Sequence, residues 1–201
     1  MPRPRKASDD DIFMAAQRAM TRLGPSELTL AAIADEAGVT AGALVQRFGS
    51  KRGLFLEAMK QFSTGTAEMF AALRAGKSSP LAAIRAYADC MAGLAPSPEG
   101  LARNLAYLQM DFTDPEFRTY LVAQGKDVSA ELAALVRAAI GAGELSKEAR
   151  PAELARTISA LISGSMMSWA CYQEGTAAAW IRADLDAILR PYRPARRRRL
   201  S

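Results

Sequence analysis

Apolar residues recur at helical spacing between residues 28 and 55. Leu30, Ile33 and Ala37 share one face of a first short helix. Leu44 and Phe48, four positions apart, give a second helix a buried stripe. The pattern therefore predicts two short amphipathic helices, joined by a turn at residues 36–39.

The residues that bound these two helices suit helix ends. Thr29 and Thr40 are good N-caps, because a hydroxyl can accept the unpaired N–H groups of an opening turn. Gly38 stands where the chain must turn sharply, and glycine adopts positive φ without steric cost. This combination is typical of a helix-turn-helix, whose second helix can lie in the major groove of DNA.

Helical periodicity continues along the rest of the 201 residues, with no convincing run of alternating β-branched residues. We predict an all-α fold of about nine helices, separated by glycine, proline and capping residues. Besides the two above, they cover residues 8–23, 51–75, 80–94, 98–110 and 151–173. A further helix begins at residues 114–115 and ends near Gly141 or Gly143, and the last one begins after residue 176 and ends before 191. The predicted domains are residues 1–50 with a basic N-terminal arm, 51–190, and a flexible basic tail, 191–201.

Residues 28–54 resemble the DNA-binding domain of the tetracycline-repressor (TetR) family. The match reads Leu-Thr…Ile-Ala…Ala-Gly-Val-Thr-x-Gly-x-Leu-x-x-x-Phe-x-Ser-Lys-x-x-Leu, with fixed spacing from Leu28 to Leu54. The order of the later helices is also similar to that family. The resemblance implies a homodimer that binds a double-stranded DNA operator, most often as a repressor. It also implies release of DNA when a small apolar or amphipathic effector enters the second domain.

A DNA interface needs phosphate anchors and base readers. Lys51 opens a helix, where a phosphate can meet both its charge and the helix N-terminus. It matches the family's phosphate-binding lysine, and Thr29 and Thr40 match positions that contact phosphates, so we expect both capping and contact from them. Base reading falls to the exposed start and outer face of the second helix: Ala41, Gly42, Ala43, Val45, Gln46 and Arg47.

Gln46 can bond adenine, Arg47 can fork onto guanine, and Ala43 or Val45 can touch a thymine methyl group. The chain departs from the family at two of these positions. A tyrosine that touches a phosphate is usual at Val45, and a histidine is usual at Arg47. Arg47 is therefore either a replacement anchor or a solvated helix charge. Arg3, Arg5 and Lys6 could reach the minor groove as a basic arm.

The family architecture favours an effector cavity among the helices that follow the DNA-binding domain. Methionine adapts to ligands of varied shape, and tyrosine adds a polar tip. The alternative for each such residue is ordinary core packing. Our candidates for the cavity are Phe62, Met69, Tyr87, Met91, Tyr107, Met110, Met166 and Trp169.

The last two predicted helices carry small and apolar residues suited to a two-fold interface. Small residues let two helix backbones approach closely. The alternative is packing within one chain. The candidates for this interface are Leu161, Gly164, Ser165, Ser168, Trp180, Ile181, Leu185 and Ile188, with Leu189 beside them.

Charge and cysteine content refine this interpretation. Residues 190–201 hold six arginines and no acid, and residues 1–52 hold eight Lys or Arg against six acids, so the ends favour a polyanion partner or are solvated tails. Cys90 and Cys171 lack metal or disulfide spacing, and we expect buried free thiols. Without an apolar leader or a run of 18 apolar residues, we expect a cytoplasmic protein that does not enter a membrane.

Two rival classes remain at this point. An all-α enzyme would need acid–base groups, but the chain has no histidine, and neither Asp184 with Asp186 nor Asp111 with Asp114 forms a persuasive carboxylate metal site. A helical adaptor or small-molecule-binding protein without sequence-specific DNA binding is the other. We therefore expect no catalytic residues, no metal and no cofactor.

Overall fold

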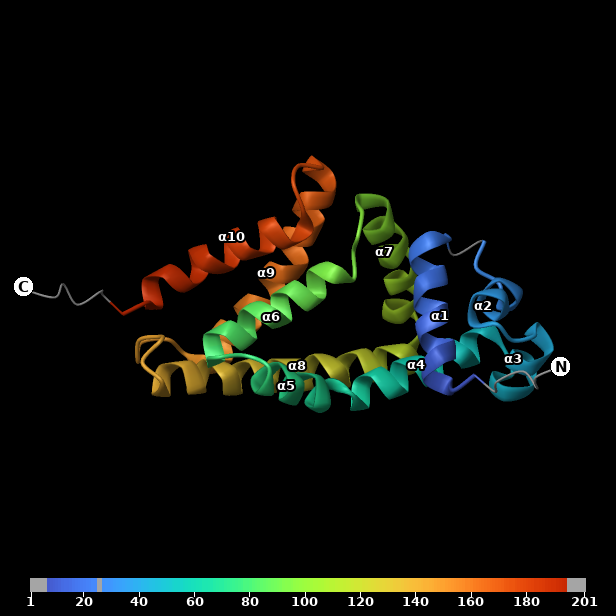
Figure 1. The fold of residues 1–201 in the computed structure, drawn as a ribbon, viewed down its shortest axis with the longest axis horizontal. Coiled ribbons are helices and arrows are strands. Elements are labelled where there is room, and N and C mark those ends of the chain that lie inside the picture. Colours follow the sequence, from blue (N-terminus) through green and yellow to red (C-terminus); the bar gives the residue numbers. More distant parts are fainter. Residues whose placement is uncertain (1–6, 25–26, 195–201) are drawn as a thin grey trace, which may run out of the picture. The chain divides into compact units, whose positions relative to one another are not determined.

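The computed structural model describes residues 7–24 and 27–194, and within helix α7 it does not describe the side chains of Met110 and Asp111. The described residues form ten α-helices, one short 3-10 helix and no strand, so the predicted all-α class is confirmed (Figure 1). The helices are α1 (Asp9–Arg22), α2 (Leu30–Ala37), α3 (Ala41–Phe48), α4 (Lys51–Thr64), α5 (Thr66–Ala75), α6 (Pro80–Gly93), α7 (Pro98–Thr113), α8 (Pro115–Gly141), α9 (Pro151–Tyr172) and α10 (Ala177–Leu189), followed by η1 (Arg190–Tyr192).

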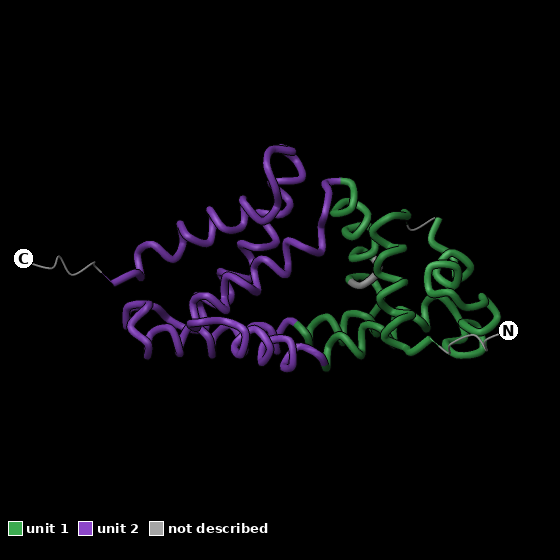
Figure 2. Tube along the Cα trace, viewed as in Figure 1, with its two compact units in different colours: residues 1–64, 99–124 green, residues 65–98, 125–201 purple. Residues whose placement is uncertain are grey.

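The chain divides into two compact units (Figure 2). Unit 1 comprises residues 1–64 and 99–124, and unit 2 comprises residues 65–98 and 125–201. The predicted domain boundary at residue 50 falls inside unit 1, because α4 and residues 99–124 group with the first three helices. No described helix is long and apolar enough to cross a membrane.

Side chains from the first four helices and α7 fill the core of unit 1. Ile12 and Phe13 of α1 meet Ile33 of α2, Leu44 of α3 and Leu54 of α4, and each of them is at most 4% exposed. Burying one such side chain contributes roughly 1.5–3 kcal/mol, so this cluster fixes the angles between short helices that would be marginal alone.

The predicted caps of this unit are present. Ser8 forms a reciprocal capping box with Asp11 at the start of α1. The hydroxyl of Thr29 accepts a hydrogen bond from the Ala32 N–H at 3.1 Å, and that of Thr40 accepts one from the Ala43 N–H at 3.2 Å. Gly38 ends α2 with φ of 67°, as the turn requires.

The sharp turn between α3 and α4 requires glycine at two positions. Gly49 has φ of 74°, a conformation that side-chain-bearing residues rarely adopt. Gly53 lies so near the end of α3 that a Cβ atom there would collide with the carbonyl oxygen of Phe48. The Gly53 N–H donates to the hydroxyl of Ser50 at 3.0 Å, which caps the first turn of α4.

The single helix predicted for residues 51–75 is instead two helices, α4 and α5, which meet at Gly65. Just before the break, the hydroxyl of Ser63 donates to the carbonyl of Lys60 and that of Thr64 to the carbonyl of Gln61. Such side-chain bonds compete with the helix ladder, and glycine adds a propensity penalty of about 1 kcal/mol. These local effects do not alter the periodicity of the apolar residues, so the periodicity predicted one continuous helix.

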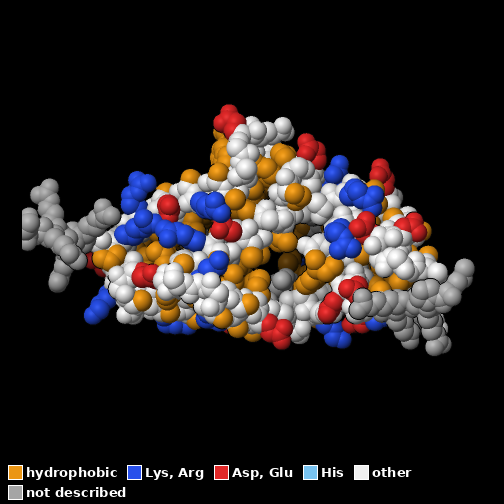
Figure 3. Space-filling view, viewed as in Figure 1, with side chains coloured by type: hydrophobic (Ala, Val, Ile, Leu, Met, Phe, Trp, Pro, Cys, Tyr) orange, Lys and Arg blue, Asp and Glu red, His pale blue; other side chains and the backbone are white. Residues whose placement is uncertain are grey.

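Unit 2 is built on α10, which packs against α6 and α9. Ile84, Ile158, Ile181 and Leu185 are completely buried among these helices. Ion pairs join α10 to α6 at the surface, between Arg85 and Asp186 and between Arg182 and Asp89. Figure 3 shows basic and acidic side chains lying side by side on the visible face of this unit.

The prediction of buried thiols is wrong. Cys90 and Cys171 are both exposed free cysteines, because each falls on the outward face of its helix, α6 and α9 respectively.

Candidate nucleic-acid interface

Helix α3 presents a small exposed face at the surface of unit 1. Leu44 is 1% exposed and anchors the helix in the core, whereas Gly42, Ala43, Val45 and Gln46 are exposed. Val45 leaves 49% of its surface open to solvent, enough for contact with a partner surface. The side chains predicted to read bases therefore stand where a DNA groove could reach them.

Lys51 is the first residue of α4, as predicted, and its ammonium group is held by the segment just before α2. Nζ donates a hydrogen bond to the carbonyl oxygen of Leu28 at 2.8 Å. The positive end of the α4 dipole lies beside the same group, and both favour an anion.

Thr29 and Thr40 flank the helix-turn-helix at the starts of α2 and α3, and both are exposed. Each hydroxyl oxygen accepts a backbone N–H of its own helix, while its O–H remains a donor. Capping and phosphate contact are therefore compatible in a single side chain.

Arg47 differs from the expectation that it faces outward to fork onto a base. Its Nε lies 2.6 Å from Oδ1 of Asp9, and its Nη1 donates to the carbonyl of Ala7 at 2.9 Å. The guanidinium also lies 5.7 Å from the ring centroid of Phe48. These contacts direct Arg47 toward the start of α1, and Gln46 is the polar side chain that remains on the outer face of α3.

The arm residues Arg3, Arg5 and Lys6 and the arginine run 196–199 lie outside the described residues. Their predicted contacts with DNA remain predictions.

Comparison with known families decides the class of this site. A family model described as "Bacterial regulatory proteins, tetR family" matches residues 12–58, which include the exposed face of α3 and Lys51. A second model, "Tetracyclin repressor-like, C-terminal domain", matches residues 82–185. The chain belongs to the TetR family. It is a ligand-responsive, DNA-binding transcriptional regulator, and the family is one of regulators and not of enzymes.

Solved structures of transcriptional regulators share the fold. A TetR regulator from Haloarcula marismortui is 17% identical, with 92% of this chain and 98% of that chain covered and a TM-score of 0.70. A putative transcriptional regulator from Saccharomonospora viridis, solved in complex with choline, is 18% identical over 92% and 97%, with a TM-score of 0.71. SmeT, the repressor of a Stenotrophomonas maltophilia multidrug efflux pump, is 20% identical over 95% and 93%, with a TM-score of 0.65. A search of curated proteins gave no significant match.

The residues predicted to line an effector cavity of this TetR regulator are divided between the two units. Phe62 and Tyr107 lie together at a cavity in unit 1, and the side chain of Met110 lies outside the described part of the structure. The candidates that belong to unit 2 are Met69, Tyr87, Met91, Met166 and Trp169.

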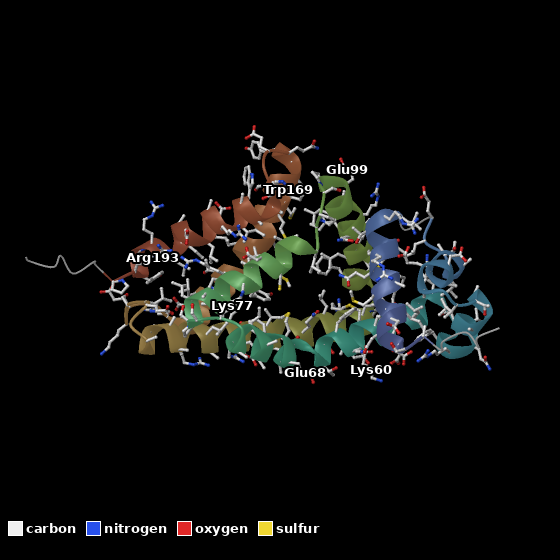
Figure 4. The ribbon with its side chains drawn as sticks, in the orientation of Figure 1. Lys60, Glu68, Lys77, Glu99, Trp169 and Arg193 are labelled. Carbon is white, nitrogen blue, oxygen red and sulfur yellow. The ribbon has the colours of Figure 1, made fainter. Side chains whose placement is uncertain are left out.

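Two of the unit 2 candidates have packing roles within that unit. Tyr87 stacks on Phe70 with ring centroids 4.9 Å apart, and burial raises its pKa to about 12. Trp169, labelled in Figure 4 near the end of α9, is 5% exposed and donates its indole N–H to the carbonyl of Gly175 at 3.3 Å. Both rings are core residues of unit 2, the alternative that the sequence left open.

The cavity in unit 1 has a volume of about 180 Å³. Tyr107 of α7 and Phe117 of α8 contribute to its wall, together with residues of two further helices. Helix α4 contributes Phe55, Ala58, Met59 and Phe62, and α1 contributes Phe13, Ala16, Gln17 and Met20. The sequence did not reveal the contribution of α1, because its cavity residues follow the same helical period as its core residues.

The predicted interface residues of α9 and α10 differ in their exposure to solvent. Gly164 and Ser168 are exposed, and Leu161, Trp180 and Ile188 are half-buried. Ser165, Ile181 and Leu185 are instead buried inside unit 2, so their assignment to an interface is corrected. The hydroxyl of Ser165 donates to the carbonyl of Leu161 and lies 2.6 Å from a carboxylate oxygen of Asp184, which locks α9 to α10 within one chain.

An ion-pair cluster beside Lys51 was not predicted. The guanidinium of Arg52 makes two hydrogen bonds to Asp114, at 2.9 and 3.0 Å, and one to Glu116 at 2.8 Å. These bonds hold the pKa of the Asp114 carboxyl below its ordinary value. Arg52 also lies 5.5 Å from the ring centroid of Phe117, a wall residue of the unit 1 cavity. Partners more than 60 residues apart leave no local signal in the sequence.

Proposed function

We propose that this TetR regulator is a cytoplasmic repressor that binds a palindromic operator as a homodimer and leaves it when a small apolar or amphipathic effector binds. The observation that carries the proposal is the exposed face of α3 with Lys51, Thr29 and Thr40 around it. Phosphate anchors on either side of a base reader are what a specific DNA contact requires.

Within this interface we assign base reading to Gln46, helped by Ala43 and Val45. A glutamine amide can bond N6 and N7 of adenine together, and small apolar side chains favour the methyl group of thymine. Arg47, engaged by Asp9, supports the helix instead of reading a base in the free protein. We therefore expect half-sites in which adenine and thymine carry most of the specificity.

Homodimer formation would use the exposed face of α9. Gly164, Met167 and Ser168 share this face, and Met167 leaves 53% of its surface exposed although it is apolar. A two-fold axis there would present two copies of α3, which need to lie about 34–36 Å apart to occupy successive major grooves.

The named relatives support the effector and the repressor role. One was solved with choline, and another is described as the repressor of an efflux pump. Ligand and DNA must then oppose each other reciprocally, with a coupling of roughly 1–3 kcal/mol.

The test is selection of duplexes from random DNA by the full-length protein, repeated with Gln46→Ala. The parent should enrich an inverted repeat, and the variant should lose preference at one position per half-site, by roughly 1–3 kcal/mol. Gln109→Ala, at an exposed glutamine of α7, is the matched control and should select the parent's sequence. Failure of the parent to enrich any sequence would contradict the proposal.

A further inference from the structure

Helix α1, which precedes the helix-turn-helix, forms one wall of the unit 1 cavity. We infer that this cavity is an effector site and that its ligand is a small, neutral, aromatic compound. The effect of this ligand on DNA binding rests on the proposed function. Binding of the ligand in the cavity does not depend on that function.

The chemistry of the wall argues for a neutral ligand. Gln17 is the one side chain with an amide among the lining residues, none of which is charged. Burying a charge without a partner is strongly unfavourable, so a carboxylate or an ammonium group would find no compensation here. Tyr107 adds a phenol, which is neutral at physiological pH, and burial raises its pKa further, to about 12.

The size and shape of the wall argue for one aromatic ring or two fused rings. A dry apolar cavity of about 150 Å³ is enough to hold benzene, and this cavity has about 180 Å³. Phe13, Phe55 and Phe117 provide ring faces and edges, which favour offset or edge-to-face contacts with another ring. Met20 and Met59 can adjust to the outline of the ligand.

Two contacts lead from the cavity to the DNA-binding residues within unit 1. The ring of Phe13 lies 5.7 Å from that of Phe48, the last residue of α3, at an interplanar angle of 49°. On the other wall, Phe117 lies beneath the guanidinium of Arg52, the neighbour of Lys51. A ligand that displaces Phe13 or Phe117 therefore acts on the end of the recognition helix or on the start of α4.

The binding test uses toluene, phenol and indole as neutral probes, and benzoate and benzylamine as charged probes of similar size. Calorimetry and ligand-detected NMR on the full-length protein should show saturable binding of the neutral probes. The charged probes should bind at least tenfold more weakly. Equal affinity for charged and neutral probes would overturn the inference.

Variants then locate the site. Ala58→Leu and Met59→Phe each add volume inside the cavity, and either one should abolish binding while the thermal unfolding transition is retained. Met59 is half-buried, so its variant remains informative if the buried Ala58 variant does not fold. Gln17→Leu should reduce the affinity for phenol relative to toluene by about two- to tenfold, the loss of one hydrogen bond. Phe112→Ala, at a 57% exposed ring of α7 outside the cavity, is the control. Unchanged binding in both filled variants would place the site elsewhere.

The consequence at DNA is measured separately. Saturating toluene or indole should weaken operator binding by about 5–150-fold in the parent and should have no effect in Met59→Phe. Operator affinity that is unchanged by a ligand bound in the cavity would refute the effector role while leaving DNA binding intact. Absence of operator binding without ligand would instead contradict the proposed function, and the calorimetric result would still stand.

Discussion

The guanidinium of Arg47, on α3, is held by the carboxylate of Asp9 at the start of α1, with 2.6 Å between Nε and Oδ1. The two residues are far apart in the sequence, yet the pair brings an acid next to the face that we assign to DNA. Both side chains are more than 40% exposed, so the pair is open to exchange with water or with a phosphate.

Replacing Asp9 by asparagine should strengthen DNA binding. The variant removes a negative charge beside the interface and releases Arg47 for a phosphate. Each added phosphate contact should steepen the dependence of log K on log salt by about 0.9. Asp10→Asn changes the charge equally, but Asp10 is paired with Gln61 and not with Arg47. A salt titration of operator affinity that gives the same slope for both variants would contradict the role given to the Asp9–Arg47 pair.

Lys51→Ala should weaken binding to all duplexes alike, because a phosphate contact carries no sequence information. The salt slope should become shallower by about 0.9 for each phosphate that a protomer no longer neutralises. Binding of the selected operator and of a scrambled duplex, measured over a range of salt, gives both quantities. Arg74→Ala, at an arginine of unit 2 that pairs with Glu131, is a control for removal of one positive charge.

Gly164→Trp should leave monomers that bind DNA poorly. Within one chain a Cβ atom at Gly164 meets nothing within 4 Å, so the substitution should not disturb folding. Sedimentation of parent and variant measures the oligomeric state. Gly125→Trp introduces the same side chain at another open helical glycine, in α8, and should remain dimeric. A parent that sediments as a monomer at micromolar concentration would remove the dimer from the proposal.

Stability should decline in alkali through Tyr87. Its folded-state pKa is about 12, above the ordinary value of 10, because burial disfavours the phenolate. The folded state therefore keeps its proton while the unfolded chain loses it, so the contribution is present below about pH 10 and disappears toward pH 12. Denaturant unfolding should show a loss of roughly 1–3 kcal/mol over that range, reduced in Tyr87→Phe. Tyr172→Phe, at a 68% exposed ring, should behave like the parent.

The parts of the structure that sequence could predict are those set by near neighbours. The caps Thr29 and Thr40, the turn at Gly38 and the start of α4 at Lys51 depend on residues within one helix turn. The direction of a side chain depends on the whole fold. Thus Arg47 carries the charge expected of a DNA contact, yet α1 brings Asp9 within reach of it.

The same reason explains the errors in α9 and α10. A helix that is apolar on two sides does not reveal which side meets its own chain and which side meets a partner. Ile181 and Leu185 fit an interface as well as a core, and packing against α6 and α9 decided between the two. The cavity residues of α1 were indistinguishable from core residues for a similar reason.

The tight turn between α3 and α4, at Gly49 and Gly53, limits which positions can be varied to obtain new operator preferences. At Gly42 an added Cβ would have 4.0 Å to its nearest neighbour, the hydroxyl of Thr40, whereas at Gly53 it would meet the carbonyl of Phe48. A library for retargeting can therefore randomise positions 42, 43, 45 and 46 while keeping Gly49 and Gly53 constant. Library members with substitutions at Gly49 or Gly53 would tilt α3, whichever bases its exposed side chains could read.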